Sequence, residues 1–552
     1  MSASAKKKLR KEQEAAQLTE KQLKAQNEAK KLKIYTTIFV VAIAIVLVAG
    51  LVIAGTTFYK NSGIRENNTI AAVVGDHEIN SVELGYFYSD AIETNYQNWT
   101  SAYGELTELY LSLMGLDITQ PLSQQNFSDD ATWADYFVDL ALENAKSCHL
   151  MCDKAQSEGF TITEDSQSAV DYTIEMLSLY APMYGYNDTE SYLRAKYGPG
   201  ASVESYSEYV QLTALASDYY NAFSDELVID DAAIRAYEAD KYNQFSSFSY
   251  ATYNVSYSHF LTGGTTDEDG NTTYTDEEKD AARAAAKAAA EAMPECSSVE
   301  ELNAAIAALP ANSSTVTECY TYDDVLYSGL NTNVRDWMSD SSRKVGDYTL
   351  VTNESTATDD NGVETTTVSG YTAYVYLGKN DNTMPLANIR HILVSFEGGT
   401  ENENGVTTYS DAEKAAALEQ AENLLEQYKQ NGETEEAFIE LAKANTDDTA
   451  SAATGGLYED ISPEQGIYVE SFTNWAVDPS REAGDTGIIE STYGYHVMYY
   501  VGDDEMTYRD SMIYNELHDN SVSEWYDAIM ASAEITKKDT SLLNKDVILS
   551  QG

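Results

Sequence analysis

The longest uninterrupted apolar stretch lies near the start of the chain. Residues 34–59 contain no Asp, Glu, Lys or Arg, and about 20 apolar residues in a helix span the hydrocarbon layer of a membrane. The preceding residues 1–33 hold ten Lys or Arg and four Glu, and such a basic flank favours the cytoplasmic side. A cleaved signal peptide is the alternative, but its apolar and basic parts are usually shorter. We therefore expect a basic cytoplasmic segment at 1–33, a retained transmembrane anchor at 34–59, and the bulk of the chain outside the cytoplasm.

Three long segments beyond the anchor have the period of amphipathic helices. Across them Tyr, Leu, Met and Ala recur at spacings of three and four residues, and the segments are Ala131–Gly159, Glu164–Tyr184 and Ser202–Phe223. A similar pattern covers Tyr508–Ala533, which could return to pack on these helices. We expect a mostly helical domain over 69–244, completed by 504–535 from the C-terminal helix and tail at 504–552.

Two stretches about 130 residues apart repeat one pattern. Ser258–Leu261 is answered by Arg390–Leu393, and each is followed by a polar insert and a long helical pattern. Later matches pair Asp336–Asp347 with Asn474–Asp485, and Ser369–Thr372 with Tyr493–His496. Each copy is predicted to run strand, insert, two helices, short helix and strand pair. The predicted fold class is therefore α+β, with tandem domains at 245–380 and 386–503 built from antiparallel sheets and surrounding helices.

Charge is distributed unevenly along the chain. The net charge is −56, although the first 33 residues carry +6. The strongly acidic remainder argues against a nucleic-acid partner, because binding phosphate needs a basic face. The excess of acid is explained by the solvation of an exported protein.

Four cysteines raise the question of metal or disulfide chemistry. Cys148 and Cys152 are spaced four apart on a predicted helix with His149 between them. A structural zinc site needs four ligands, so these two are predicted to be buried structural thiols. Whether Cys296 and Cys319 form a disulfide is open at this point.

The second copy resembles the parvulin-type peptidyl-prolyl isomerases. The resemblance covers roughly 386–503 and rests on the order and spacing of several short motifs: Arg390–Leu393, Phe438–Ala442, Thr446–Ser451, Gly455–Leu457, Phe472, Gly484–Asp485 and Tyr493–Val497. With the helical region before it and the helix after it, the chain beyond the anchor is similar to the PrsA/SurA foldase family. The resemblance implies isomerisation of X-Pro peptide bonds with no cofactor and no metal.

The same resemblance assigns roles to particular residues. It implies a facing pair of histidines, His391 and His496, with Asp448 at the acidic position and Ser491 in their hydrogen-bond network. It also implies that Leu457, Tyr468 and Phe472 line a pocket for the proline ring. Asp447 adjoins Asp448, and either could instead be a turn or cap residue.

The first copy differs from the second at these positions. It keeps His259 but aligns Thr372 with His496, Val334 with Phe472 and Asn312 with Asp448. We therefore expect 245–380 to be a degenerate parvulin-like domain without isomerase activity.

Besides a surface protein that uses the duplicated domains as stalk modules, two functions from different classes remain open at this point. The first is a membrane-anchored extracytoplasmic foldase that binds unfolded exported polypeptides and isomerises their X-Pro bonds. The alternative is a non-catalytic holdase chaperone that uses the parvulin fold only for binding.

Overall fold

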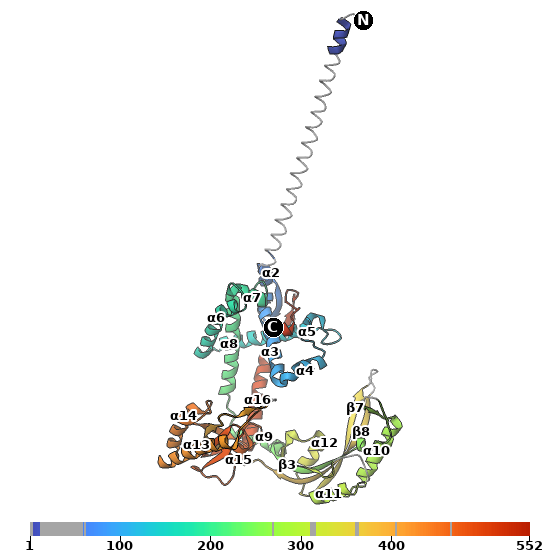
Figure 1. Cartoon of the computed structure of the whole chain (residues 1–552), viewed down its shortest axis with the longest axis vertical. Helices are drawn as coiled ribbons and strands as arrows, with labels where there is room; N and C mark the ends of the chain where they lie inside the picture. Colours follow the sequence, from blue (N-terminus) through green and yellow to red (C-terminus); the bar gives the residue numbers. More distant parts are fainter. Residues whose placement is uncertain are drawn as a thin grey trace. The chain divides into compact units, whose positions relative to one another are not determined.

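A computed structural model describes residues 4–11, 59, 62–267, 270–309, 316–358, 364–402, 406–463 and 466–551. The predicted anchor lies outside these residues except for Tyr59, as does most of the basic segment. Within the described ranges, no helix has the length and apolar character needed to cross a membrane. The chain divides into unit 1, up to Leu227 and again from Ser521, and unit 2, Val228–Asn520 (Figure 1).

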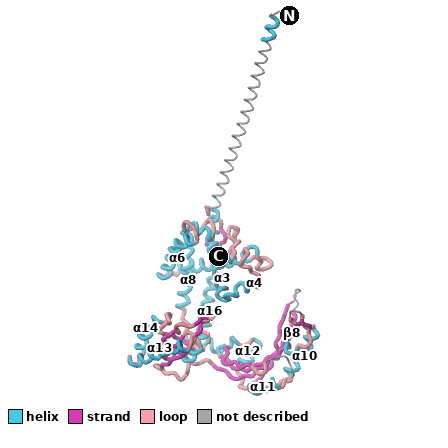
Figure 2. The backbone as a smooth tube through the Cα atoms, viewed as in Figure 1, coloured by secondary structure: helices cyan, strands magenta, loops and turns pink. Residues whose placement is uncertain are grey.

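Unit 1 is mostly helical with one small sheet (Figure 2). Its helices are α2 (Ile64–Asn68), α3 (Ser81–Tyr103), α4 (Thr107–Leu113), α5 (Trp133–Ser157), α6 (Glu164–Met183), α7 (Thr189–Tyr197) and α8 (Val203–Glu226). Its sheet has the order β15 (Ile535–Lys537), β1 (Ile70–Val74), β2 (His77–Asn80). The long helices α5, α6 and α8 confirm the three periodic segments to within a few residues.

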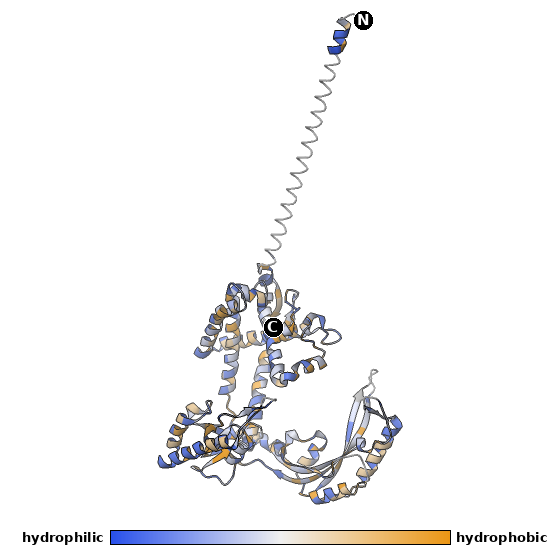
Figure 3. Ribbon diagram, viewed as in Figure 1, coloured by the Kyte–Doolittle hydropathy of each residue, from blue (hydrophilic) through white to orange (hydrophobic). Residues whose placement is uncertain are grey.

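Capping side chains set the starts of these helices. Thr132 and Asp135 form a reciprocal capping box at the start of α5, which satisfies backbone N–H groups that have no partner inside the helix. Each helix carries both hydrophobic and hydrophilic residues along its length (Figure 3). The apolar faces of the helices meet in a core that includes Trp133 and Phe137. The C-terminal segment joins this core through Ile529, and Trp525 packs against it. Trp525 also stacks on Phe223 with ring centroids 3.9 Å apart.

The helical domain ends earlier than the expected residue 244. The next helix, α9 (Asp231–Lys241), belongs to unit 2. Its apolar residue Ile234 packs with Phe245 and Ile513 in a small core of unit 2. Periodicity shows that a helix has an apolar face, but not which core that face joins.

The four cysteines are free thiols. Cys148 and Cys152 lie on α5, where burial raises the pKa of each thiol to about 12. They are therefore protonated at neutral pH, in keeping with structural residues. No cluster of three or more His, Cys, Asp or Glu suited to a metal ion occurs among the described residues.

Unit 2 contains two four-stranded antiparallel sheets, each with its own helices. The first lobe has the sheet β6 (Tyr320–Leu326), β3 (Ser247–Ser256), β8 (Glu364–Asn380), β7 (Tyr348–Thr358), with α10 (Asp276–Glu291), α11 (Val299–Ala307) and α12 (Thr332–Ser339). The second lobe has the sheet β12 (Leu457–Ile461), β9 (Pro385–Ser395), β14 (Gly494–Thr507), β13 (Thr486–Glu490), with α13 (Asp411–Gln430), α14 (Glu435–Asn445) and α15 (Glu470–Ala476). A last helix, α16 (Tyr508–Met530), runs across the boundary between the units.

A small hairpin follows β3 in the first lobe, and another follows β9 in the second lobe. They are β4 (Thr265–Thr266) with β5 (Thr272–Thr273) and β10 (Thr400–Glu401) with β11 (Thr407–Thr408). Each leads into a helix that begins with a capping box, Thr275 with Glu278 in α10 and Ser410 with Glu413 in α13. The glutamate also accepts a hydrogen bond from a glycine N–H of the preceding loop in both lobes.

The strand registers correct one sequence alignment. On β14, His496 is paired with Leu393 and Met498 with His391. On β8, Thr372 is paired with Asn254 and Tyr374 with Thr252. The position equivalent to His391 is therefore Thr252.

His259 lies beyond the end of β3, in a 3₁₀ turn at Tyr257–Phe260. The connection from Ser256 to Gly264 is four residues longer than that from Ser395 to Gly399. The sequences around His259 and His391 are similar, but the two residues do not occupy equivalent positions in their lobes. The expected counterpart of Asp448, Asn312, lies outside the described residues.

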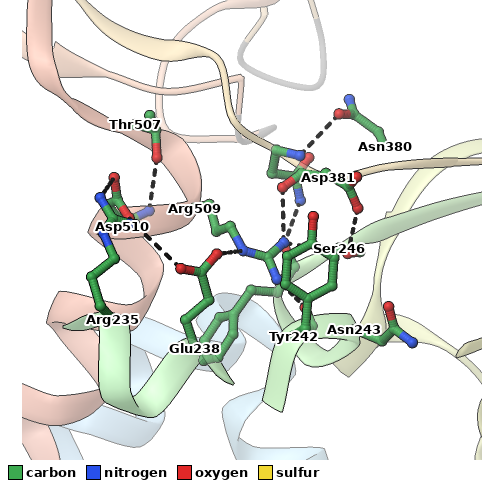
Figure 4. Close-up of polar contacts among 12 residues, drawn as sticks. Arg235, Glu238, Tyr242, Asn243, Ser246, Asn380, Asp381, Thr507, Arg509 and Asp510 are labelled. Atoms are coloured by element: carbon green, nitrogen blue, oxygen red, sulfur yellow. Dashed lines mark hydrogen bonds and ion pairs between the residues drawn. The ribbon is translucent and has the colours of Figure 1, made fainter. Parts of the chain in front are cut away.

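Arg509, near the start of α16, joins three segments of unit 2 (Figure 4). Its side chain is only 1% exposed. Nε donates to Glu238 on α9 at 2.8 Å, and the guanidinium also donates to the backbone carbonyl oxygens of Asp381 and Tyr242. The same group lies over the Tyr242 ring, 3.9 Å from its centroid. Arg509 thus connects α9 and the turn after it, the link between the two sheets, and α16.

We predict that Arg509→Met lowers the free energy of unfolding of unit 2 by about 3 kcal/mol, because it leaves Glu238 and two carbonyl oxygens without their buried donor. Chemical denaturation followed by circular dichroism measures the change. Lys443→Met is the control, since Lys443 and Glu440 form an exposed pair 3.9 Å apart and such pairs contribute less than about 1 kcal/mol. Equal shifts for the two variants would contradict the role of Arg509.

Candidate active site

The central strands of the second lobe bring two histidines together. His391 on β9 and His496 on β14 are far apart in the chain, but the antiparallel register sets them on neighbouring strands two residues out of step. Both point to the face covered by α15, and both are at least 95% buried. Their rings stack with centroids 5.1 Å apart and an interplanar angle of 20°.

The two rings form the centre of a hydrogen-bonded chain. Nδ1 of His391 lies 2.9 Å from Nδ1 of His496. Nε2 of His391 lies 2.9 Å from Oδ2 of Asp448, and Nε2 of His496 lies 2.8 Å from Oγ of Ser491. The structure therefore brings His391, His496, Asp448 and Ser491 into one network.

Donor and acceptor counting fixes the direction of this chain. A carboxylate only accepts, so Nε2 of His391 carries a proton and donates to Asp448. A neutral His391 then accepts at Nδ1 from the N–H of His496, and His496 accepts at Nε2 from the hydroxyl of Ser491. Both imidazoles are neutral in this arrangement, and every ring nitrogen has a partner.

The pKa values agree with neutral rings. Burial lowers the pKa of His391 despite the nearby Asp448 carboxylate. Burial and the neighbouring His391 lower the pKa of His496 to about 4. For Asp448, burial acts to raise the pKa, but hydrogen bonds from Ser451, His391 and Tyr458 outweigh it and hold the pKa at about 2.

The two adjacent aspartates have different roles. Asp448 accepts hydrogen bonds from His391, from the hydroxyl of Tyr458 at 3.0 Å and from Ser451. Asp447 instead accepts from the backbone N–H of Ser395 at 2.8 Å, at the end of β9. Asp448 therefore belongs to the site, and Asp447 fastens the loop to the sheet.

A cavity of about 450 Å³ opens above the histidine pair. Its lining comes from β9, β12, β14, α15 and the loops beside them, and consists of His391, Leu393, Asp448, Tyr458, Gly466, Ile467, Tyr468, Val469, Phe472, Tyr493 and His496. Phe472 packs edge-on against both imidazoles, with centroids 5.3 Å from His391 and 5.7 Å from His496. The floor is thus polar and internally paired, whereas the walls are aromatic and apolar.

Leu457 does not line this cavity, contrary to the sequence-based prediction. It is paired with Arg390 across β12 and β9, whereas Tyr458 is paired with Ile389. Successive residues of a strand point to opposite faces, so Tyr458 shares the face of His391 and Leu457 does not. The motif identified the right strand but the wrong side of it.

Tyr458 and Ser451 were not predicted as site residues. Ser451 follows Asp448 by three residues and donates to its carboxylate, a spacing that is common in turns. Tyr458 could have been found from strand alternation, had the register with β9 been known.

Gly456 allows the strand beside the site to approach closely. Its φ is +75°, and a Cβ at this position would lie 2.0 Å from the carbonyl oxygen of His391. Its own carbonyl accepts from the N–H of His391 at 2.9 Å. Only glycine fits both the backbone angle and the contact.

We predict that acid destabilises the second lobe in two separate pH windows. The pKa of His496 is about 4 in the fold against 6.5 for the unperturbed group, so the unfolded chain binds the proton first and stability falls as pH drops from 6.5 to 4. The loss is up to about 3 kcal/mol. The pKa of Asp448, about 2 against 3.8, gives a further loss below 3.8.

Unfolding free energies measured between pH 7 and pH 3 test this profile. His391→Asn with His496→Asn flattens the upper window. An identical slope in the wild type and the double variant between pH 6.5 and 4 would disprove the assignment.

Comparisons with known proteins agree with this geometry. Residues 373–502 match the family model of the PPIC-type PPIASE domain. No curated protein matches the chain.

Several solved structures resemble parts of the chain. Peptidylprolyl isomerase (PrsA) from Bacillus anthracis is 20% identical, with 28% of this chain and 59% of that chain covered and a TM-score of 0.17. PrsA from Bacillus subtilis is 22% identical over 29% of this chain and 54% of its own, with a TM-score of 0.18. Foldase protein PrsA from Streptococcus pneumoniae is 13% identical over 75% of this chain and 92% of its own, with a TM-score of 0.21.

The chain thus spans little more than half the length of the two Bacillus proteins. At these identities and TM-scores, the likeness carries no activity or partner to this chain. The family match covers the strands and helices that hold the histidine pair. Residues 373–502 of the chain therefore contain a domain that matches the PPIC-type PPIASE family.

Proposed function

We propose that the chain is a membrane-anchored extracytoplasmic foldase, in which the second lobe isomerises X-Pro bonds and unit 1 binds unfolded exported polypeptides. The observation that carries the proposal is the aromatic-walled cavity of about 450 Å³ over a buried pair of neutral imidazoles. A proline ring is apolar and compact, and a cavity of this kind excludes water from the peptide bond next to it.

Excluding water is a sufficient chemical task for this reaction. Rotation about an X-Pro bond has a barrier of about 18 to 20 kcal/mol, because resonance gives the C–N bond double-bond character and places charge on the oxygen. Water stabilises that polar planar form, so an apolar site favours the twisted one. An acceleration of three to five decades requires only about 4 to 7 kcal/mol.

The histidine chain shapes the floor of the site and transfers no proton. Each ring nitrogen of His391 and His496 already has a partner, so neither ring is free to act as a base. Phe472 packs edge-on against both imidazole rings, so the rings hold this aromatic wall in place. Tyr458 is likewise fixed at its hydroxyl by Asp448.

Unit 1 offers a surface suited to unfolded polypeptides. Large apolar side chains are exposed on α6 and just after it: Tyr172, Leu179, Tyr180, Met183, Tyr184 and Tyr186. Exposed clusters of this kind are unusual on soluble domains, and Met and Tyr adapt to varied partners. The membrane anchor rests on the charge-free run 34–59 and its basic flank.

We propose that the first lobe does not isomerise proline. Thr252 and Thr372 stand where the second lobe has His391 and His496. Val334 stands where the second lobe has the aromatic side chain of Phe472. Each is the first buried residue of its short helix, three positions before Trp337 in α12 and Trp475 in α15. The first lobe has the scaffold without the floor pair.

We predict that Phe472→Ala lowers kcat/KM for isomerisation of a short Ala-Pro peptide by about 10- to 100-fold, because the proline ring loses its apolar wall. Exchange NMR on the full extracytoplasmic chain measures the rate. His259→Ala is the matched control and leaves the rate unchanged. Loss of activity in His259→Ala, with full activity in Phe472→Ala, would assign catalysis to the first lobe instead.

A second prediction separates the foldase from a holdase that only binds. His391→Asn with His496→Asn abolishes isomerisation but keeps suppression of aggregation of an unfolded client, measured by light scattering. Leu179→Ser with Met183→Ser has the opposite effect, because both side chains are more than half exposed on α6. If the intact chain shows no isomerase rate while it suppresses aggregation, the holdase is the correct function.

A further inference from the structure

The first lobe contains a cavity of its own, on the other side of its sheet from the position of the lost histidine pair. Its volume is about 170 Å³, and its lining includes Tyr257, Arg283, Ala286, Lys287, Gly370 and Tyr371. Arg283 and Lys287 come from α10, which packs against β8 and the turn after β3. Figure 1 shows α10 beside β8.

Two cations in one small cavity stand out in a chain with a net charge of −56. Their acidic neighbours are largely in solvent: Asp280 beside Arg283 has a side chain 75% exposed, and Glu291 lies 3.7 Å from Lys287. Exposed ion pairs have a small interaction free energy, so these acids hold the two cations only weakly. Both cations remain available to an anion.

The guanidinium of Arg283 has unused donors. Nη1 donates to Asp280 at 2.9 Å, and the group lies over the Tyr257 ring, 5.1 Å from its centroid. Nε is buried and has no hydrogen-bond partner among the described residues. A buried donor without a partner is costly, and the planar guanidinium of arginine matches the two oxygens of a carboxylate through paired N–H groups.

The second lobe provides an internal comparison. Counted from the capping boxes Thr275–Glu278 and Ser410–Glu413, Arg283 corresponds to Leu418 and Lys287 to Glu422. The helix scaffold is the same, but the two positive charges occur only in the lobe that lacks the histidine pair. The two lobes have therefore diverged at separate sites.

We propose that this cavity of the first lobe binds a carboxylate group of a polypeptide, with Arg283 as the bidentate donor and Lys287 as the second cation. Tyr257 and Tyr371 flank the cavity and suit an apolar or aromatic residue next to the carboxylate. Carboxylate binding is independent of isomerase activity, whereas the polypeptide nature of the ligand rests on the proposed function.

Binding of three labelled peptides to the extracytoplasmic chain, measured by fluorescence anisotropy, tests the proposal. The first peptide is Ala-Ala-Tyr with an N-terminal label and a free C-terminal carboxylate. The second has the same sequence and label but a C-terminal amide. The third has a C-terminal amide and an internal Glu. We expect the free acid to bind at least about 10-fold more tightly than the amide. Tight binding of the third peptide as well would extend the site to side-chain carboxylates.

Variants taken from the second lobe identify the residues responsible. Arg283→Leu and Lys287→Glu each introduce the residue found at the equivalent position of α13, and each weakens binding of the free acid by about 10-fold or more. Lys279→Leu removes a positive charge from the same helix outside the cavity and leaves affinity within about 2-fold. Thermal unfolding by circular dichroism verifies that each variant is folded.

The proposal is overturned if the free acid and the amide without Glu bind equally, or if the folded Arg283 and Lys287 variants bind like the wild type. Arg283→Leu keeps full isomerase activity on a short Ala-Pro peptide, because the second lobe is unchanged. A chain with no isomerase activity that still discriminates acid from amide would refute the proposed function and leave the carboxylate site intact.

Discussion

The antiparallel pairing of β9 with β14 is the constraint on which the site depends. It places His391 and His496 on adjacent strands, close enough for a direct hydrogen bond between their Nδ1 atoms. A shift of the register by one residue would turn one imidazole to the opposite face of the sheet. Gly456 protects this arrangement, because it lets β12 approach the backbone of His391 on the other side.

Burial then decides the chemistry of the pair. Two imidazoles removed from water would repel each other if charged, and burial lowers the pKa of both. The neutral rings can satisfy each other and the polar groups at either end, Asp448 and Ser491. A buried polar network is stable only when all its members are paired, and this one is. The result is a rigid polar floor below an apolar space, which suits a reaction that needs desolvation but no proton transfer.

The two lobes of unit 2 separate scaffold from site. Both have the same strand order, and in both an arginine lies over a tryptophan, Arg343 over Trp337 and Arg481 over Trp475. One further hydrogen bond also recurs, since Gly346 in the first lobe and Gly484 in the second each donate to a tyrosine carbonyl at 2.8 Å. These contacts hold helix and sheet together and do not touch the histidine positions. The scaffold can therefore be retained while the chemistry at its surface changes.

Much of the architecture was readable in the chain itself. The periods of α5, α6 and α8 and the repeated motifs depend on residues near one another in sequence, so local patterns reveal them. The spacing of the parvulin motifs also led to His391, His496, Asp448, Ser491, Tyr468 and Phe472, all of which meet at the cavity or its network.

Long-range pairing decided the rest. Leu457 and Tyr458 are neighbours in the chain, but only the register between β12 and β9 shows which of them faces the cavity. Likewise, His259 resembles His391 in its surrounding letters, although a longer connection places it beyond the end of β3. Such outcomes depend on contacts between residues distant in sequence, whose relative positions are set by strand pairing and packing and leave no local pattern in the chain.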